Sequence, residues 1–224
     1  MSKRNRSETY RLHISGDYAC FTRPEMKIER VSYDIITPSA ARGVLEAILW
    51  KPAIRWNIEQ IELLKPIQWT SVRRNEVKEV ASIANAKKAM NAGKGDLGLL
   101  IEDHRLQRAS LLLRDVAYVI QASFHMTDAA GEREDCRKFE QMFRRRMDKG
   151  QHFHHPYLGC REFPACVRWA EESDQALSEE NRSLGWMLLD MNYSSKNPYP
   201  MFFNAEFNKG IVRVPSLNSE EVRS

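Results

Sequence analysis

Apolar and polar residues follow patterns along the first third of the chain that predict two strands separated by a helix. Residues 10–15 alternate weakly and end at a Gly-Asp turn signal, which indicates a first strand. Thr37 places a capping hydroxyl before a proline, and apolar residues then recur at helical spacing up to a Lys-Pro pair at residues 51–52, which predicts a helix. Residues 54–63 alternate with one short break and predict a second, bulged strand.

The remaining patterns predict an insertion, two more strands and a second helix. Residues 81–98 are rich in Ala, Asn, Lys and Gly, with little apolar content to offset the entropy of ordering, so we expect a mobile insertion there. Residues 111–126 alternate as a long third strand. Residues 136–147 carry apolar side chains at spacings of three and four and precede a glycine suited to a helix C-terminus. Further strand patterns occupy residues 163–169, 184–191, 201–207 and 211–214.

The predicted order β-α-β-β-α-β across residues 10–169 is the ferredoxin-like pattern, an α+β fold with both helices on one face of an antiparallel sheet. The acidic residues 171–180 have the composition of a solvated loop or linker. We therefore expect a ferredoxin-like (RRM-like) domain over residues 1–169, which contains the mobile insertion, and a small β-rich region with an antiparallel sheet over residues 170–224.

Composition narrows the class of protein. Hydrophobic residues at 42% and charged residues at 29% are typical of soluble globular proteins, and no apolar run approaches the length of a membrane span. The basic N-terminus is not followed by the apolar stretch of a signal peptide, so we expect a cytoplasmic protein with no membrane partner. Four cysteines occur without a Cys-x-x-Cys pair, which is typical of reduced thiols.

Charge is segregated along the chain although the net charge is only +4. Residues 133–161 hold eight Lys or Arg against four acids, whereas residues 170–181 hold five acids and no Lys or Arg. Basic clusters grip phosphates, but a solvated helix face near a C-terminus, where the helix dipole favours cations, explains the same pattern. The candidate RNA-binding residues are Arg42, Lys51, Arg55, Arg73, Arg74, Arg144, Arg145 and Arg146. The interleaved Trp50, Trp56 and Trp69 fit a core better than a base-stacking surface.

Histidines form a second chemical feature. His152, His154 and His155 follow the arginine-rich helix and precede Cys160 and Cys166, yet their spacing matches no common zinc pattern, so we expect no metal or other cofactor. Imidazoles titrate near neutral pH and suit general acid or base roles in RNA cleavage, although plain surface histidines are the commonest outcome. The glycine pattern of residues 93–98 lacks the preceding strand that a dinucleotide site needs.

Several segments resemble the CRISPR repeat-processing endoribonuclease of type I-C systems, the d subtype of the Cas-five family. The resemblance spans nearly the whole chain and rests on Gly16-Asp17-Tyr18-Ala19-Cys20-Phe21-Thr22-Arg23-Pro24-Glu25, Ser32-Tyr33-Asp34, Pro38-Ser39-Ala40-Ala41-Arg42-Gly43, Trp50-Lys51-Pro52-Ala53-Ile54-Arg55-Trp56, Arg73-Arg74-Asn75-Glu76-Val77 and Leu158-Gly159-Cys160-Arg161-Glu162-Phe163-Pro164.

The resemblance implies a ferredoxin-like domain with a small C-terminal sheet, and metal-independent cutting of CRISPR precursor RNA within each repeat, beside its hairpin. It also implies the partners: the repeat RNA hairpin, the mature crRNA, and the backbone and large subunits of the type I-C surveillance complex. Double-stranded DNA is a further candidate partner.

The family's catalytic pattern is only partly present. It has an aromatic or histidine residue two positions before the Lys-Pro pair, where this chain has Leu49, and a Lys-His pair opening the second helix, where this chain has Lys138-Phe139. The resemblance therefore implies that Lys138 stabilises charge on the scissile phosphate, and it leaves the proton-transfer roles vacant. The substitute candidates are, in falling order, His152, His154, His155, Tyr18 and Tyr33.

Two other functions compete with RNA cleavage. The protein is alternatively a binding module that holds the repeat-derived end of the guide RNA without cutting it. A metal-dependent DNA nuclease ranks last, because no cluster of carboxylates stands out from the surface charge.

Overall fold

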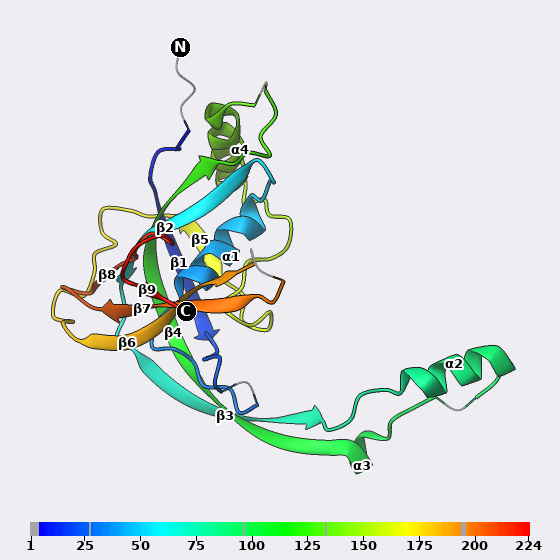
Figure 1. The fold of residues 1–224 in the computed structure, drawn as a ribbon. Helices are drawn as coiled ribbons and strands as arrows, with labels where there is room; N and C mark the ends of the chain where they lie inside the picture. The colour runs from blue at the N-terminus through cyan, green and yellow to red at the C-terminus, as the bar shows by residue number, and fades with distance from the viewer. Residues whose placement is uncertain (1–4, 27, 96, 133, 194–195) are drawn as a thin grey trace.

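The computed structural model describes residues 5–26, 28–95, 97–132, 134–193 and 196–224, and it is a mixed α+β structure with two antiparallel sheets (Figure 1). No helix in these ranges is long and apolar enough to cross a membrane. In chain order the elements are β1 (Tyr10–Ala19), α1 (Pro38–Ile48), β2 (Ile54–Leu63), β3 (Gln68–Val77), α2 (Ile83–Ala92), α3 (Ile101–His104), β4 (Arg105–Met126), α4 (Cys136–Asp148), β5 (Cys166–Trp169), β6 (Ser183–Asn192), β7 (Tyr199–Glu206), β8 (Ile211–Arg213) and β9 (Val222–Arg223).

The larger sheet has the strand order β5-β1-β4-β2-β8, and every neighbouring pair is antiparallel. The strands predicted over residues 10–15, 54–63 and 111–126 are confirmed, and each of the first and third is longer than its apolar alternation indicated. The expected break in the second strand is a bulge between Ile58 and Gln60. The fourth strand is confirmed over its last four residues.

Both predicted helices are confirmed, and they pack on the face of the large sheet that carries its apolar side chains. Thr37 accepts a hydrogen bond from the Ala40 amide, so α1 begins with the expected cap. From α4, Phe143 lies 4.7 Å from the ring of Trp56 and 4.9 Å from that of Tyr10, centroid to centroid. The buried aromatic cluster confirms a core position for Trp56, whereas Trp50, with 60% of its surface exposed, does not join the core.

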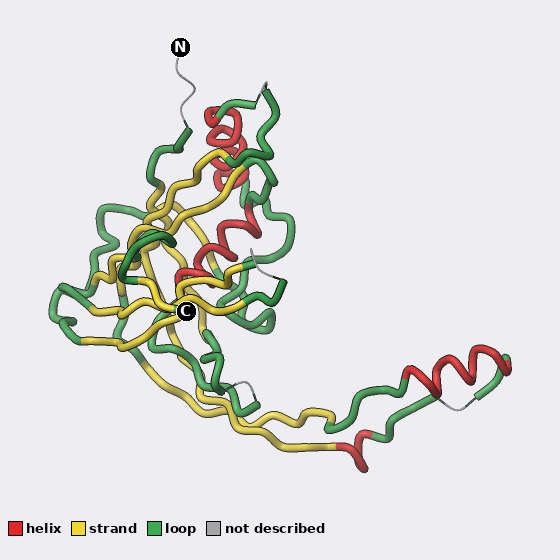
Figure 2. The backbone as a smooth tube through the Cα atoms, viewed as in Figure 1, coloured by secondary structure: helices red, strands yellow, loops and turns green. Residues whose placement is uncertain are grey.

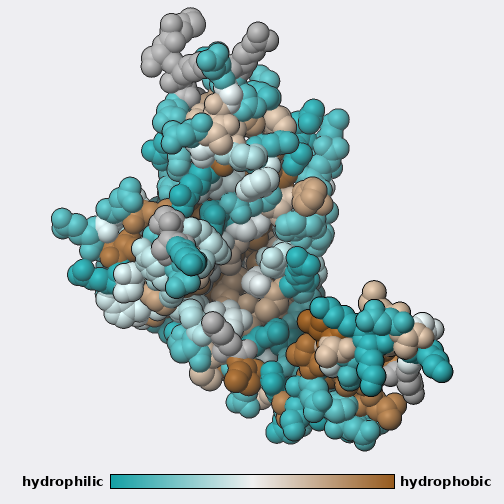
Figure 3. All heavy atoms as spheres, turned by 45° about the vertical axis from the view of Figure 1, so that its right-hand side comes forward, coloured by the Kyte–Doolittle hydropathy of each residue, from teal (hydrophilic) through white to brown (hydrophobic). Residues whose placement is uncertain are grey.

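A projecting arm, formed by β3, α2, α3 and residues 105–114 of β4, extends from the sheet (Figures 1 and 2). Sequence periodicity did not predict β3. The insertion expected at residues 81–98 contains α2, none of whose residues is buried, and its mobility remains a prediction. Large apolar side chains are exposed on the arm, among them Val80, Ile83 and Met90, and the hydrophobic patches are visible in Figure 3.

The C-terminal region forms the smaller sheet, with strand order β6-β7-β9. The prediction that residues 211–214 belong to this sheet is wrong: β8 pairs with β2 at the edge of the large sheet, and the short β9 supplies the third strand. Met187 and Phe203 of the small sheet lie in the same hydrophobic core as the large sheet. The boundary near residue 170 remains a prediction.

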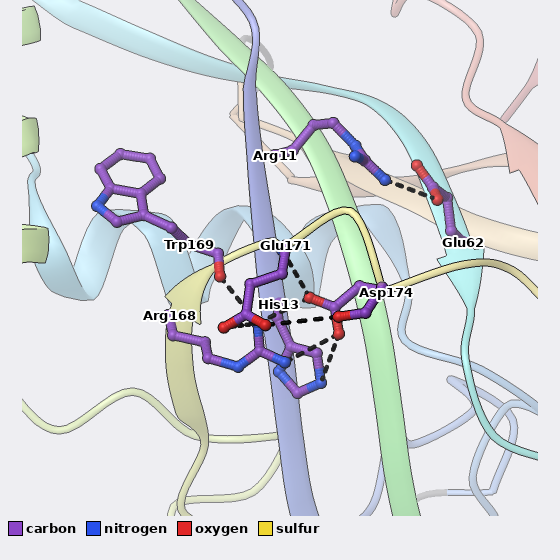
Figure 4. A network of polar contacts seen from close by, with 8 residues as sticks. Arg11, His13, Glu62, Arg168, Trp169, Glu171 and Asp174 are labelled. Atoms are coloured by element: carbon purple, nitrogen blue, oxygen red, sulfur yellow. Dashed lines mark hydrogen bonds and ion pairs between the residues drawn. The ribbon is translucent and has the colours of Figure 1, made fainter.

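The acidic loop of residues 170–181 crosses the outer face of the large sheet, the face opposite the helices (Figure 4). Arg168 donates two hydrogen bonds of 2.7 and 2.8 Å to the carboxylate of Asp174, which also accepts a 2.8 Å hydrogen bond from the Glu171 amide and lies 3.9 Å from His13. The Leu177 amide donates to the carbonyl of Leu63 on β2. The sequence predicted a solvated loop or linker, but the Asp174 side chain is only 10% exposed because Arg168 holds it against the sheet.

Candidate functional site

Lys138 lies at the start of α4, in the first turn after the N-cap Asp135. Its ammonium group donates a 2.9 Å hydrogen bond to Glu134, and the side chain remains 53% exposed. The pKa of Glu134 is lowered, first by this hydrogen bond and also by the charge of Lys51. Lys51, in the segment after α1, and Lys138, in the first turn of α4, therefore place two cations near one half-buried carboxylate. We call this place the helix junction.

The two positions at which the family's catalytic pattern is absent both point into the protein. Leu49 is fully buried and Phe139 is 1% exposed. The Leu49 carbonyl accepts a 2.9 Å hydrogen bond from the indole of Trp56, and the Ile48 carbonyl accepts one from Arg146. Neither apolar side chain transfers a proton, so any acid or base must come from elsewhere on the surface.

His125 is an imidazole that sequence reasoning missed. It lies near the end of β4, exposed, in register with Arg55 of β2 on one side and bridged to Arg6 on the other. Its pKa is lowered, chiefly by partial burial and further by the charges of Arg55 and Arg6. The ring is consequently neutral at pH 7, which is the form that a general base needs.

The end of β4 is attached to the segment that follows α1. The Thr127 amide donates to the Ala53 carbonyl over 3.0 Å, and its hydroxyl donates to the Pro52 carbonyl over 2.6 Å. His125 thus lies two residues before Thr127, which contacts Pro52, the residue after Lys51. The signal for an outward-facing His125 in the sequence was the alternation of side chains along a strand, because a histidine next to the core residue Phe124 must lie on the opposite face.

The three loop histidines lie beyond the other end of α4. Ten residues separate Lys138 from Asp148, a rise of about 15 Å along a helix. The rings of His152 and His155 are perpendicular with centroids 5.1 Å apart, and the Phe153 amide donates to the Ala47 carbonyl of α1 over 2.8 Å. His154 stacks loosely on Tyr157 at 5.9 Å. Within the described ranges, no three His, Cys, Asp or Glu side chains form a metal-binding group.

The two candidate tyrosines are far from Lys138 or enclosed. Tyr18 is 46% exposed and pairs with Arg114 of β4. Tyr10, at the other end of β1, contacts Phe143 of α4. Eight residues of strand separate Tyr18 from Tyr10, a distance of about 26 Å. Tyr33 is 2% exposed, and the Arg23 guanidinium lies 4.5 Å above its ring. Burial raises the pKa of Tyr33. The structure therefore does not bring either tyrosine to the helix junction.

Most of the candidate RNA-binding arginines have partners within the protein. Arg42 binds Asp190 at 2.6 Å and Glu46 at 3.2 Å, and Arg55 approaches Asp190 at 3.9 Å. Arg74 pairs with Glu162, and Arg144 pairs with Glu8. Among the described residues no carboxylate pairs with the remaining three cations that reach solvent, namely Lys51, Arg73 and Arg145.

Comparison with known proteins identifies relatives along nearly the whole chain. A Cas5d family model, described as CRISPR-associated protein (Cas_Cas5), matches residues 9–215. A protein of Mannheimia succiniciproducens named CRISPR pre-crRNA endoribonuclease Cas5d is 52% identical over 95% of this chain and 97% of its own length. A protein of the same name from Thermus thermophilus is 37% identical over 95% of this chain and 93% of its own length.

Solved structures share the fold. A structure described as a CRISPR-associated protein superposes with a TM-score of 0.70 at 21% identity over 98% of both chains. A chain of a CRISPR RNA-guided surveillance complex superposes with a TM-score of 0.51 at 12% identity, covering 92% of this chain and 88% of its own.

Proposed function

Because the chain belongs to the Cas5d family of CRISPR-associated proteins, we propose that it is an endoribonuclease that cuts CRISPR precursor RNA within each repeat, beside the hairpin. The observation that carries this proposal is the 52% identity, over 95% of the chain, to a protein named for that activity. The strand order β5-β1-β4-β2, with α1 and α4 on one face, supports a ferredoxin-like core as the platform.

The proposed reaction needs no metal. A base removes the proton of a ribose 2′-hydroxyl, the oxygen attacks the adjacent phosphorus, and the 5′-oxygen leaves with a proton from an acid. The products carry a 2′,3′-cyclic phosphate and a 5′-hydroxyl. Lys138 and Lys51 stabilise the charge on the phosphate, because ammonium groups aimed at a developing charge favour the transition state.

We assign the general base to His125 and the proton for the leaving 5′-oxygen to solvent water, because His152 and His155 lie beyond the end of α4 that is about 15 Å from Lys138. The neutral ring of His125 and its attachment to the segment after α1 support the role of general base. The loop that carries His152 and His155 contacts Ala47 of α1 at the opposite end of α4 from Lys138, so neither histidine receives a role. Tyr18 and Tyr33 receive no role, since neither reaches the helix junction.

Single-turnover cutting of cognate repeat RNA in EDTA tests the assignment. We expect Lys138→Ala to lower the rate about 10²–10³-fold and His125→Ala about 10²–10⁴-fold. Lys149→Ala, at the other end of α4, and His104→Ala, on the arm, are the matched controls and should leave the rate within about twofold of wild type. Cutting by the wild type only when Mg²⁺ is added would refute the metal-free reaction.

The buried Leu49 and Phe139 favour a second function, in which the protein binds the repeat-derived end of the RNA without cutting it. In that case the wild type retards the repeat hairpin in a gel, with strong salt dependence, and releases no product. In either case we propose that it remains with the mature crRNA as a subunit of a type I-C surveillance complex. Co-purification of the processed RNA with the other subunits is the direct test.

A further inference from the structure

A groove of about 850 Å³ lies where the outer faces of the two sheets meet, between β2 and β8 on one side and β6, β7 and β9 on the other. Gln60 belongs to its lining and is six residues along β2 from Ile54, about 20 Å from the segment after α1. The groove is therefore separate from the helix junction, and nothing in the proposed cleavage reaction uses it.

Strand registers explain why polar groups line this groove. In the small sheet, Trp186 pairs with Asn204 and Phe202 pairs with Arg223, and their buried neighbours Met187 and Phe203 face the core. In the large sheet, Gln60 pairs with Arg213, while the next pair, Ile61 and Val212, is buried. Because side chains alternate between faces, Trp186, Asn204, Arg213 and Arg223 must all face outward.

The charges in the groove favour an anionic ligand at two points. Arg213 and Arg223 both line it, and in the described part of the chain neither guanidinium has a carboxylate or other side-chain partner. Lys209 adds a third cation to the groove. Glu206 and Glu221 also line it, and their negative charges repel a phosphate near them. A planar guanidinium binds phosphate through two hydrogen bonds, which gives position as well as affinity.

Trp186 supplies an aromatic face beside these cations. It is 52% exposed, and its neighbours in the groove include the amide side chains of Gln60, Asn204 and Asn208. An accessible indole stacks on any nucleobase, and amides donate to and accept from base edges. Phe203 is buried and Ile211 is half-buried, so the groove offers too little apolar surface to hold a hydrophobic peptide.

We propose that this groove binds unpaired nucleotides that flank the repeat hairpin, with a base on Trp186 and phosphates on Arg213 and Arg223. The volume lies within the range of about 300–1,000 Å³ for ligand sites and suits a short single-stranded segment rather than a duplex. The choice of RNA as ligand rests on the proposed function, whereas the groove, its indole and its guanidiniums are independent of it.

The test compares two RNA probes, the repeat hairpin with its single-stranded flanks and the hairpin alone. We expect Trp186→Ala and Arg213→Ala each to weaken binding of the flanked RNA about 5- to 150-fold and to leave binding of the bare hairpin unchanged. Trp186→Phe, which keeps an aromatic face, should retain most of the affinity. Tyr193→Ala removes a 71% exposed aromatic residue just beyond β6, outside the groove, and is the matched control.

Ultraviolet crosslinking of the flanked RNA to wild-type protein should join the RNA to the peptide that contains Trp186. Equal affinity of wild type and both alanine variants for the flanked RNA, with no crosslink in β6, overturns the groove proposal even if the wild type cuts the repeat. Groove-dependent binding without cutting leaves the groove proposal standing and overturns the endoribonuclease proposal. A wild type that binds neither probe overturns both.

Discussion

Replacing Asp174 with asparagine should loosen the acidic loop from the outer face of the large sheet. The two hydrogen bonds from Arg168 lower the pKa of the Asp174 carboxyl from 3.8 to about 2. A difference of about 1.8 units, at about 1.4 kcal/mol per unit, gives an upper value of about 2.5 kcal/mol. Because the Arg168 side chain is 40% exposed, solvent screens the pair, and we expect Asp174→Asn to lower the free energy of unfolding by about 1–2 kcal/mol at pH 7.

The pH dependence of this loss follows from the direction of the pKa shift. A carboxyl whose pKa is lower in the folded protein stabilises it at any pH above the unfolded value of 3.8. The contribution declines as pH falls from about 4 and is lost below pH 2, where the carboxyl becomes protonated in both states. The difference between wild type and variant should therefore be constant from pH 7 to pH 5 and shrink by about half near pH 3.

Urea unfolding followed by tryptophan fluorescence, repeated at several pH values, measures this difference. Glu172→Gln is the matched control, because Glu172 is exposed in the same loop and its side chain makes no hydrogen bond or ion pair among the described residues. It should change the free energy of unfolding by less than about 0.5 kcal/mol. A difference between wild type and Asp174→Asn below that value at pH 7, or one that persists undiminished at pH 3, would refute the reasoning.

Three further predictions concern other parts of the fold. Gly159 has φ +81, and a Cβ there would lie 2.0 Å from the Cys20 carbonyl oxygen. Gly159→Ala should therefore lower the free energy of unfolding, measured by heat or urea, by at least about 3 kcal/mol. Gly43→Ala is the control, because a Cβ at this position of α1 meets nothing within 4 Å, and it should raise the free energy of unfolding by about 0.5–1 kcal/mol. The hydrogen bond between Cys160 and Cys20, together with the charges of Arg30 and Arg74, lowers the pKa of the Cys160 thiol, so iodoacetamide labelling of Cys160 read by mass spectrometry should rise with a midpoint below the ordinary thiol value of 9.0, and a midpoint at or above 9.0 would contradict this. Replacing residues 81–98 with a short Gly-Ser linker should change the free energy of unfolding by less than about 0.5 kcal/mol, since no residue of α2 is buried; a loss above 1 kcal/mol would show that the arm supports the core.

Apolar periodicity was enough to predict the elements that form the core. α1 and α4 each bury one stripe, and β1 and the first half of β2 alternate between buried and more exposed side chains, whereas the second half of β4 is buried at almost every position. β3 escaped prediction because its side chains on both faces are partly or fully solvent-exposed, so burial imposed no pattern on a segment that includes Arg73, Arg74 and Asn75. β8 has only three residues, and the path of the chain before it, rather than its own sequence, decides which of the two sheets it joins.

The candidate site was predictable only in part, for a similar reason. Lys138 could be placed at a helix start from local spacing. His125 looked like an ordinary strand residue, because its significance depends on two cations from distant segments, Arg6 and Arg55. The groove at Trp186 forms between two sheets, and no local sequence pattern encodes how these sheets are placed relative to each other.

The continuity of β4 restricts how the arm can differ among related chains. A single strand of 22 residues serves the arm at one end and the core at the other, paired with β3 over Gln68–Val77 and with β1 and β2 beyond. Adding or removing one residue on either strand would turn every side chain beyond it to the opposite face. The arm can therefore lengthen or shorten without disturbing its surface only by matched pairs of residues on both strands, and its length should vary in steps of two.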